Sequence, residues 1–218
     1  MTRRLVLVRH GRTAWNHTKR VQGQTDVDLD DVGLAQAEQA ATVLAGYTPD
    51  LVWCSDLRRA RQTIAPIAAA CGREVHYDAR LREFSLGERE GLTHDEYRAI
   101  DAEEFDLFRA GYYDRAPGAE PTAVVRARMH EALTELLGLL PASGGTALAL
   151  SHGAAIRVAV GALLGWPDDA FHTLRALGNC GWAEFVEHPE VGGLKLEAYH
   201  RSPFPPAGAA PARPDQAF

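Results

Sequence analysis

The sequence predicts a three-layer α/β/α fold with a mostly parallel central sheet and a small helical insertion. Short, continuous apolar runs alternate with longer stretches of helical periodicity, which is typical of parallel strands buried between two layers of helices. Three of these runs end in polar residues, as strands do at the ligand-binding edge of an open sheet. A chain of 218 residues can bury about 70% of its unfolded surface, so its core needs neither disulfides nor metal ions.

The apolar runs give the expected strands, which in chain order are 5–8, 51–54, 75–77, 146–150, 182–186 and 194–199. The third run is short and has the character of an edge strand. After the first run, Asp30 or Asp31 should cap a helix that Gly46 closes. Leu57 begins the next helical stretch, in which Pro66 predicts a kink or an early end.

Residues 93–121 have a helical pattern that glycines and prolines interrupt, which predicts the helical insertion. A long helix is expected over about 124–140, and another begins after Gly153. Beyond Arg201 the chain turns to proline, alanine and glycine. We therefore expect one domain over residues 1–201 and a disordered tail over residues 202–218.

The charge balance argues against a partner with a long anionic surface. The chain has 23 Lys and Arg against 29 Asp and Glu, a formal charge of −6, whereas nucleic acids and anionic membranes require a broad basic face. Three cysteines form no CxxC pair and leave an odd thiol, which indicates a reducing compartment. No apolar run fits a signal peptide or spans a membrane. We expect a cytoplasmic protein, and the sequence leaves both a monomer and a homodimer open.

Basic side chains follow three of the expected strands. Arg9 and His10 follow the first, Arg58 the second and His152 the fourth. Because the carboxyl ends of parallel strands meet at one edge of a sheet, these side chains should share a crevice. Either arginine alone would be expected to form an ion pair on the surface. Two arginines that share one crevice require an anion to offset their charge. Guanidinium groups suit phosphate oxygens, and a helix beginning after Gly153 adds backbone donors.

Several motifs then point to a known family. The run Arg9-His10-Gly11-Arg12-Thr13, with Asn16 after it, resembles the signature of the histidine phosphatase superfamily, in the branch of the cofactor-dependent phosphoglycerate mutases and related phosphatases. The resemblance covers about residues 4–187 and continues through Gln22-Gly23, Ser55-Asp56-Leu57-Arg58-Arg59-Ala60, Leu81-Arg82-Glu83 and Leu150-Ser151-His152-Gly153 with Ile156-Arg157. It implies a phosphoglycerate mutase-like fold and a metal-independent phosphomonoesterase that works through a phosphohistidine intermediate.

The resemblance also implies roles for individual side chains. His10 would be the nucleophile, which must be neutral to attack and which passes the phosphoryl group on to water. Glu83 would protonate the leaving oxygen and then deprotonate the attacking water, whereas alone it would be a solvated charge. His152 would stabilise the charge on the transferring group, although a helix cap is its structural alternative. The residues expected to bind the phosphate are Arg9, Asn16, Gln22, Gly23, Arg58, His152 and Gly153.

No metal ion or organic cofactor is expected. Asp26, Asp28 and Asp30 superficially suggest a calcium loop, but Asp31 stands where such a loop needs glycine and Ala37 where it needs glutamate. The expected partner is a small phosphorylated metabolite.

Two other functions stay open: a phosphotransferase like the phosphoglycerate mutases, and a non-catalytic phospholigand-binding module on the same fold. The stretch from Val21 to Asp26 has the phosphatase-like form, and the presence of both a histidine and a glutamate at the catalytic positions disfavours the non-catalytic module. Near the expected mouth, Arg89 could recognise a second acidic group such as a carboxylate, although an exposed, solvated arginine is favoured. Glu120 is a weaker site candidate.

Overall fold

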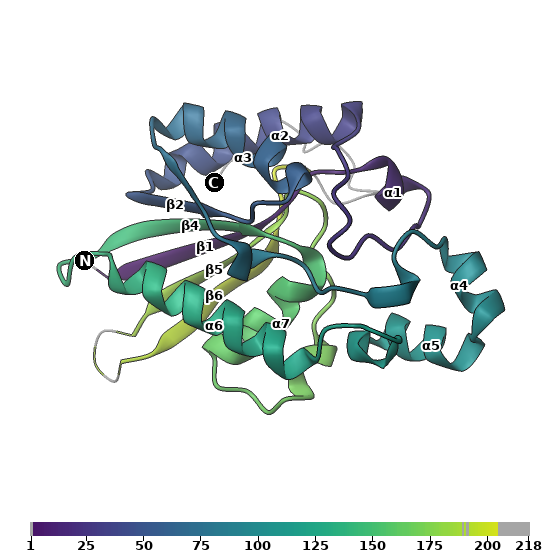
Figure 1. Ribbon diagram of the computed structural model, residues 1–218. Helices are drawn as coiled ribbons and strands as arrows, with labels where there is room; N and C mark the ends of the chain where they lie inside the picture. The colour runs from purple at the N-terminus through teal and green to yellow at the C-terminus, as the bar shows by residue number, and fades with distance from the viewer. Residues whose placement is uncertain (1, 189, 191, 205–218) are drawn as a thin grey trace, which may run out of the picture.

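The computed structural model describes residues 2–188, 190 and 192–204, and in them a six-stranded sheet lies between two layers of helices (Figure 1). The strand order is β3-β2-β4-β1-β5-β6, in which the first four strands run parallel, β5 pairs antiparallel with β1, and β6 pairs antiparallel with β5. The strands are β1 (Arg3–Arg9), β2 (Leu51–Cys54), β3 (Val75–Tyr77), β4 (Gly145–Ser151), β5 (Trp182–Glu187) and β6 (Leu194–Arg201). The predicted α/β class, the mostly parallel sheet and all six expected strands are confirmed.

Two helices cover each face of the sheet (Figure 1). One layer contains α2 (Asp31–Leu44) and α3 (Arg58–Cys71), and the other contains α6 (Thr122–Gly138) and α7 (Gly153–Leu163). Successive residues of β1 point to opposite faces, so Val6 and Val8 join the apolar cluster under α2 and α3, while Leu5 and Leu7 join the cluster under α6 and α7. A central strand buried on both faces has to be apolar throughout, which explains the unbroken run in the sequence.

The first helical layer shows where helix signals in the sequence hold and where they fail. The side chain of Asp30 caps α2 by accepting a hydrogen bond from the Gly33 amide, as predicted. Pro66 does not end α3, which runs on to Cys71 and stops where Gly72 takes the left-handed conformation. Fully buried Ile64 and Ile67 hold both sides of the proline against the sheet, and this packing outweighs the missing hydrogen bond.

Two glycines bring the loop after β1 against the first turn of α2. A Cβ atom on Gly33 would lie 1.9 Å from the carbonyl oxygen of Arg12, and one on Gly11 would lie 2.7 Å from the carbonyl oxygen of Gly33. No side chain fits at either place, so glycine is required for this close approach. The contact fixes the backbone that carries His10.

The helical insertion forms α4 (His94–Ile100) and α5 (Ala102–Ala110), which lie at one end of the molecule beside α1 (Ala14–His17) (Figure 1). It encloses its own aromatic cluster, in which Phe108 packs against Tyr97 and Tyr113. Neither expectation for Arg89 is right, because its guanidinium is buried and donates to both oxygens of Glu104 in α5, at 2.8 and 3.2 Å. Arg89 therefore ties the insertion to the domain.

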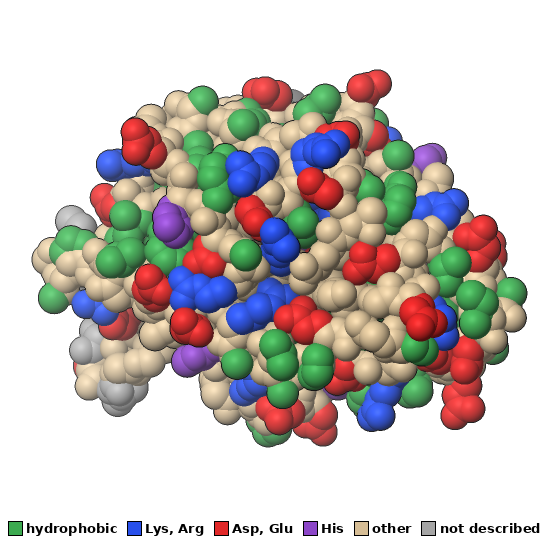
Figure 2. Space-filling view, in the orientation of Figure 1, with side chains coloured by type: hydrophobic (Ala, Val, Ile, Leu, Met, Phe, Trp, Pro, Cys, Tyr) green, Lys and Arg blue, Asp and Glu red, His purple; other side chains and the backbone are tan. Residues whose placement is uncertain are grey.

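Most of the expected tail, residues 205–218, lies outside the described residues, whereas Phe204 is half-buried against the apolar cluster under α2 and α3. On the face drawn in Figure 2, Lys and Arg side chains are interspersed with Asp and Glu rather than gathered into one basic surface. None of the helices in the described part of the chain is long and apolar enough to cross a membrane.

Candidate active site

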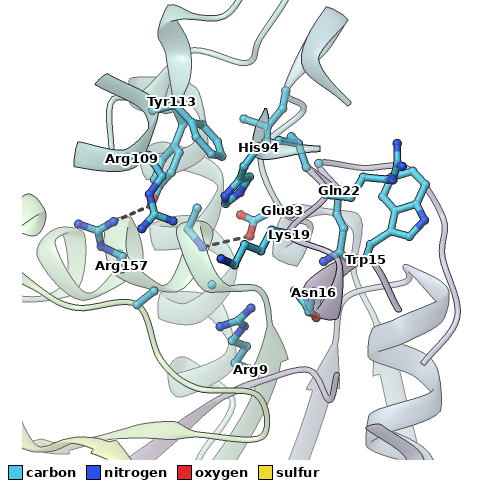
Figure 3. A pocket seen from close by; sticks show the side chains of 18 of the residues that line it. Arg9, Trp15, Asn16, Lys19, Gln22, Glu83, His94, Arg109, Tyr113 and Arg157 are labelled. Atoms are coloured by element: carbon cyan, nitrogen blue, oxygen red, sulfur yellow. Dashed lines mark hydrogen bonds between the residues drawn. The ribbon is translucent and has the colours of Figure 1, made fainter. Parts of the chain in front are cut away.

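A cavity of about 760 Å³ opens beyond the carboxyl ends of β1 and β4, between the sheet and the helical insertion (Figure 3). Its walls come from the loop after β1, the loop of Glu83, the insertion, the start of α7 and the segment 172–176. Of the predicted site residues, those that line it are Arg9, His10, Asn16, Gln22, Gly23, Glu83 and Gly153. Arg58 and His152 do not line it.

The ring of His10 is held in one tautomer. Its Nδ1 atom lies 2.7 Å from the carbonyl oxygen of Gly11, and because a carbonyl only accepts, Nδ1 must carry the proton. The other ring nitrogen, Nε2, therefore has a free lone pair when the ring is neutral. Burial, reinforced by the nearby guanidinium groups of Arg59 and Arg9, lowers the pKa of His10 well below its ordinary value near 6.5. The structure thus holds a neutral imidazole with the electron pair that a nucleophile needs.

Arg9 places a guanidinium group beside the N-terminus of α7. Its Nη1 donates to the carbonyl oxygen of Leu177, and its buried Nε has no hydrogen-bond partner. Burial lowers the pKa of Arg9, but an arginine remains charged under such a shift. A Cβ atom on Gly153 would lie only 3.3 Å from that Nε, so the glycine permits the arginine and the helix N-terminus to converge. An anion placed there would meet both.

The second arginine of the cavity is Arg59, not Arg58. The side chain of Arg58 is 53% exposed and forms ion pairs with Asp28 at 3.1 Å and Asp26 at 3.7 Å. Arg59, one residue further along α3, is almost fully buried and lines the cavity. Neighbouring residues of a helix point about 100° apart, so only one of the two can face the sheet edge. The placement of Arg58 in the phosphate site was wrong.

Arg59 is fixed by three hydrogen bonds around the cavity floor. Its Nη2 donates to the carbonyl oxygen of Gly23 at 2.7 Å, its Nη1 to that of Thr25 at 2.9 Å, and its Nε to Nδ1 of His152 at 3.2 Å. Burial lowers the pKa of Arg59 to about 10, which leaves it protonated at neutral pH. A cation held this rigidly is set in place before any substrate arrives.

His152 lies behind His10, with ring centroids 5.1 Å apart. Nδ1 of His152 accepts from Arg59, so its proton sits on Nε2, which is 2.8 Å from the Ser55 hydroxyl oxygen. Burial and the charge of Arg59 lower the pKa of His152 well below its ordinary value. Both ring nitrogens are engaged within the protein, and the side chain does not cap α7. The structure thus makes His152 a neutral support for Arg59.

Two amide side chains on the opposite wall present donors to the cavity. The Asn16 side-chain oxygen accepts from the amide of Thr13 at 3.1 Å and from Nδ2 of Asn179 at 3.3 Å. The oxygen of Gln22 accepts from the Thr13 hydroxyl at 3.1 Å. With their acceptors occupied, both side chains have NH₂ groups left for a ligand, and both line the cavity (Figure 3).

Glu83 reaches the start of α7. Its Oε1 accepts from the backbone amides of Ala155 at 2.8 Å and Phe84 at 3.0 Å, and its Oε2 accepts from that of Ala154 at 3.0 Å. A carboxylate is favoured at a helix N-terminus by the free N–H groups and by the helix dipole. Among the described residues that line the cavity, Glu83 carries the only carboxylate.

Glu120, the weaker site candidate, lies outside the cavity and stabilises the loop that carries Glu83. It forms a two-point ion pair with Arg128 at 2.8 and 2.9 Å, and Arg128 donates in turn to the carbonyl oxygens of Arg82 at 2.6 Å and Glu83 at 2.9 Å. Within the described residues, no group of three or more His, Cys, Asp or Glu side chains is arranged to hold a metal ion.

Besides Arg59, the cavity residues that had no role assigned from the sequence include Lys19, Arg109, Tyr113 and Arg157. Arg157 is the only charged residue in α7, whose sequence is GAAIRVAVGAL. A single charged residue on an otherwise apolar, buried helix could have indicated a functional role. The others lie outside the matched motifs, and the sequence held no signal for them.

The two buried neutral histidines predict how stability depends on pH. In the unfolded chain they bind protons below about pH 6.5, whereas in the folded protein their lowered pKa values keep them neutral. The unfolded state then binds more protons, so the free energy of unfolding should fall between pH 7.5 and pH 5.5. In the variant His10→Asn, whose amide can still donate to Gly11, the slope should be shallower by up to about 1.4 kcal/mol per pH unit.

Urea unfolding at pH 7.5, 6.5 and 5.5 measures both slopes. Identical slopes for the wild type and His10→Asn would show that His10 is not a neutral buried group.

Comparisons with known proteins show which family the chain is related to. The chain is 37% identical over 196 residues to a glucosyl-3-phosphoglycerate phosphatase of Mycolicibacterium vanbaalenii, covering 88% of this chain and 87% of the relative. It is 38% identical over 189 residues to a probable phosphoglycerate mutase of Erwinia tasmaniensis, covering 84% of each. The solved structure of a mycobacterial glucosyl-3-phosphoglycerate phosphatase complexed with VO₃ superimposes with a TM-score of 0.86 at 34% identity, covering 92% of this chain and 100% of that one. The model of the histidine phosphatase superfamily (branch 1) matches residues 5–198, and the chain belongs to that family.

Proposed function

We propose that the protein is a phosphomonoesterase that hydrolyses a small organic phosphate through a phosphohistidine at position 10. The observation that carries the proposal is the neutral ring of His10, with Nε2 unprotonated, in a cavity that also holds the guanidinium groups of Arg9 and Arg59 and the carboxyl group of Glu83. The names of the relatives support a phosphate ester as the substrate. A cytoplasmic location stays a prediction of the sequence, which leaves both a monomer and a homodimer open.

In the first step, the lone pair of His10 Nε2 attacks phosphorus, and the bond from phosphorus to the ester oxygen breaks. Arg9, Arg59, the NH₂ groups of Asn16 and Gln22, and the N-terminus of α7 surround the phosphoryl oxygens and offset their charge. An alkoxide is a poor leaving group, so Glu83 acts as the general acid and donates a proton from its carboxyl group to the leaving oxygen. The alcohol departs, and the phosphoryl group stays on the ring.

In the second step, water attacks the phosphohistidine on the face that the alcohol has left. Glu83, now a carboxylate, takes a proton from this water, so that a hydroxyl oxygen forms the new bond to phosphorus while the bond from Nε2 to phosphorus breaks. Inorganic phosphate leaves, His10 is again neutral, and Glu83 again carries the proton for the next cycle.

Phosphate release tests the function directly. With a chelator present, the protein should release phosphate from sugar phosphates, phosphoglycerates and an aryl phosphate, because every group in the two steps is an organic side chain. A bisphosphorylated primer should not be needed. Activity that the chelator abolishes, or phosphoglycerate isomerisation that requires the primer in place of phosphate release, would contradict the proposal and, in the second case, favour the mutase.

Adjacent arginines of α3 provide a matched pair for the phosphate site. Replacing a preorganised cavity donor costs about 10²- to 10³-fold in kcat, so Arg59→Gln should show a loss of that order, whereas Arg58→Gln should stay within about threefold of the wild type. Steady-state kinetics on an aryl phosphate measures both. A larger loss in Arg58→Gln than in Arg59→Gln would overturn the assignment.

Glu83→Gln separates proton donation from the other steps. The amide cannot donate at carboxylic acid strength, so turnover of alkyl phosphates should fall by about 10²- to 10⁴-fold. The loss on p-nitrophenyl phosphate should be far smaller, because its leaving group needs little protonation. Equal losses of kcat/KM on the two substrates would exclude Glu83 as the acid.

A further inference from the structure

A four-residue turn carries two of the acceptors that hold Arg59 in place. The turn runs from Gln22 to Thr25, and a hydrogen bond of 3.0 Å from the Thr25 amide to the Gln22 carbonyl oxygen closes it. Gly23 has a φ of +53° in this turn, a conformation that glycine adopts without strain. Because the carbonyl oxygens of Gly23 and Thr25 accept from Arg59, the position of the guanidinium depends on where the turn lies.

Glu90 holds the opposite side of the same turn. Its carboxylate accepts four hydrogen bonds, all of them from neutral donors. These donors are the amides of Gln24 at 3.0 Å and Leu86 at 2.9 Å on Oε1, and the amide at 3.0 Å and hydroxyl at 2.6 Å of Thr25 on Oε2. A Cβ atom on Gly23 would lie 2.0 Å from Oε1, so the turn can approach the carboxylate this closely only with glycine there.

The two charged groups bind the same stretch of backbone. The Gly23 carbonyl oxygen, which accepts from Arg59, belongs to the same peptide group as the Gln24 N–H. That N–H donates to Glu90. In a trans peptide the two groups point in opposite directions, so the peptide dipole is aligned between cation and anion, and each hydrogen bond strengthens the other. Thr25 likewise donates its N–H to Glu90 and accepts from Arg59 at its carbonyl oxygen.

This arrangement leaves the charge of Arg59 available to a phosphate. Three of its five N–H groups bind the protein, which leaves two for a ligand. A carboxylate bound directly to the guanidinium would occupy those donors and offset the charge that a phosphate needs. Glu90 lies on the far side of the turn and does not line the cavity. Burial lowers the pKa of Arg59 to about 10, and Glu90 is among the carboxylates whose charges oppose this shift.

We infer that Glu90 is a positioning residue, which acts through the turn on Arg59 and so sets the geometry of phosphate binding. The inference rests on the proposed phosphatase function, in which Arg59 contacts the phosphoryl oxygens. The turn also touches the loop of Glu83, because Nε2 of Gln24 donates to the Glu83 carbonyl oxygen at 3.0 Å. A test of the inference therefore has to separate an effect on Arg59 from an effect on Glu83.

A double-mutant cycle tests whether Glu90 acts through Arg59. Glu90→Gln keeps the size of the side chain but turns one acceptor oxygen into an NH₂ group that faces the donors of the turn. A displaced guanidinium should lower kcat/KM for p-nitrophenyl phosphate about 10- to 100-fold. In the Arg59→Gln background the same substitution should cost less than about threefold, because the group that it positions is already gone. Equal losses in the two backgrounds overturn the inference.

Two substrates separate this route from the one through Glu83. Loss of proton donation affects an alkyl phosphate far more than p-nitrophenyl phosphate, whereas a misplaced phosphate-binding cation affects both alike. Glu90→Gln should therefore lower kcat/KM by the same factor for p-nitrophenyl phosphate and for an alkyl phosphate that the wild type hydrolyses. A loss confined to the alkyl phosphate assigns Glu90 to the loop of Glu83 and overturns the inference.

Two other carboxylates provide matched controls. Glu88 is exposed, lies two residues before Glu90 and is 3.9 Å from Arg89. Glu184 is buried and forms ion pairs with Arg4 and Arg201. Neither lines the cavity. Glu88→Gln controls for the lost charge and Glu184→Gln for lost stability, and both should keep the wild-type kcat/KM. A loss in either that equals the loss in Glu90→Gln overturns the inference.

Thr25→Val keeps the inference testable should Glu90→Gln fail to fold. The substitution removes the hydroxyl that donates to Glu90 and leaves the carboxylate and both backbone amides in place. It should lower kcat/KM for p-nitrophenyl phosphate several-fold, and this loss should vanish in the Arg59→Gln background. A loss that persists there overturns the inference.

The guanidinium also gives a signal that does not depend on turnover. The buried Nε–H of Arg59 donates to His152, so it should exchange slowly with water and give a ¹H–¹⁵N resonance that is missing in Arg59→Gln. Glu90→Gln should shift or broaden this resonance, and an unchanged resonance overturns the inference. A wild type that hydrolyses no phosphomonoester contradicts the proposed function instead, whatever Glu90→Gln does to the resonance.

Discussion

The candidate active site depends on one constraint, which is that two guanidinium groups lie beside two imidazoles and have only neutral hydrogen-bond partners in the part of the chain that the structure describes. Arg9 and Arg59 both lie at the carboxyl edge of the sheet, and burial already lowers their pKa values. Burial, reinforced by their charges, lowers the pKa values of His10 and His152 and keeps both rings neutral, so the positive potential that attracts a phosphate also helps to preserve the proposed nucleophile. Substrate binding relieves the unfavourable burial of these charges, which ties recognition to catalysis.

The rest of the fold fixes the positions of these arginine and histidine side chains. Close contact between Gly11 and Gly33 fixes the backbone of His10, the proposed nucleophile, the Glu120–Arg128 pair holds the loop of Glu83, and His152 supports Arg59. These supports are a steric contact between backbones and hydrogen bonds between buried or partly buried side chains. Such elements move little, and preorganised donors need no rearrangement during the reaction. The helical insertion closes the other side, with Arg89 fastening it through Glu104.

The fold and most of the site could be predicted because they depend on local patterns and on motif order. Unbroken apolar runs marked the buried strands, and the His-Gly pair at the end of the first strand marked a histidine that lines the cavity. The error at Arg58 came from counting residues beyond the strand without the phase of the helix that follows. Arg59 shares the buried stripe of α3 with Thr63 and Ile67, at spacings of four and eight, so the helical period already pointed to it. Residues such as Arg109 and Tyr113 reach the cavity through the packing of the insertion, which local patterns do not encode.

The central claim is that His10 carries the phosphoryl group during turnover. The most direct measurement mixes the protein with a ³²P-labelled phosphomonoester, quenches within milliseconds in base and follows the label on the protein. The account predicts label on His10 that is stable in base, lost in acid and missing in His10→Asn. Phosphate release without any labelled protein, or label that persists in His10→Asn, would contradict it.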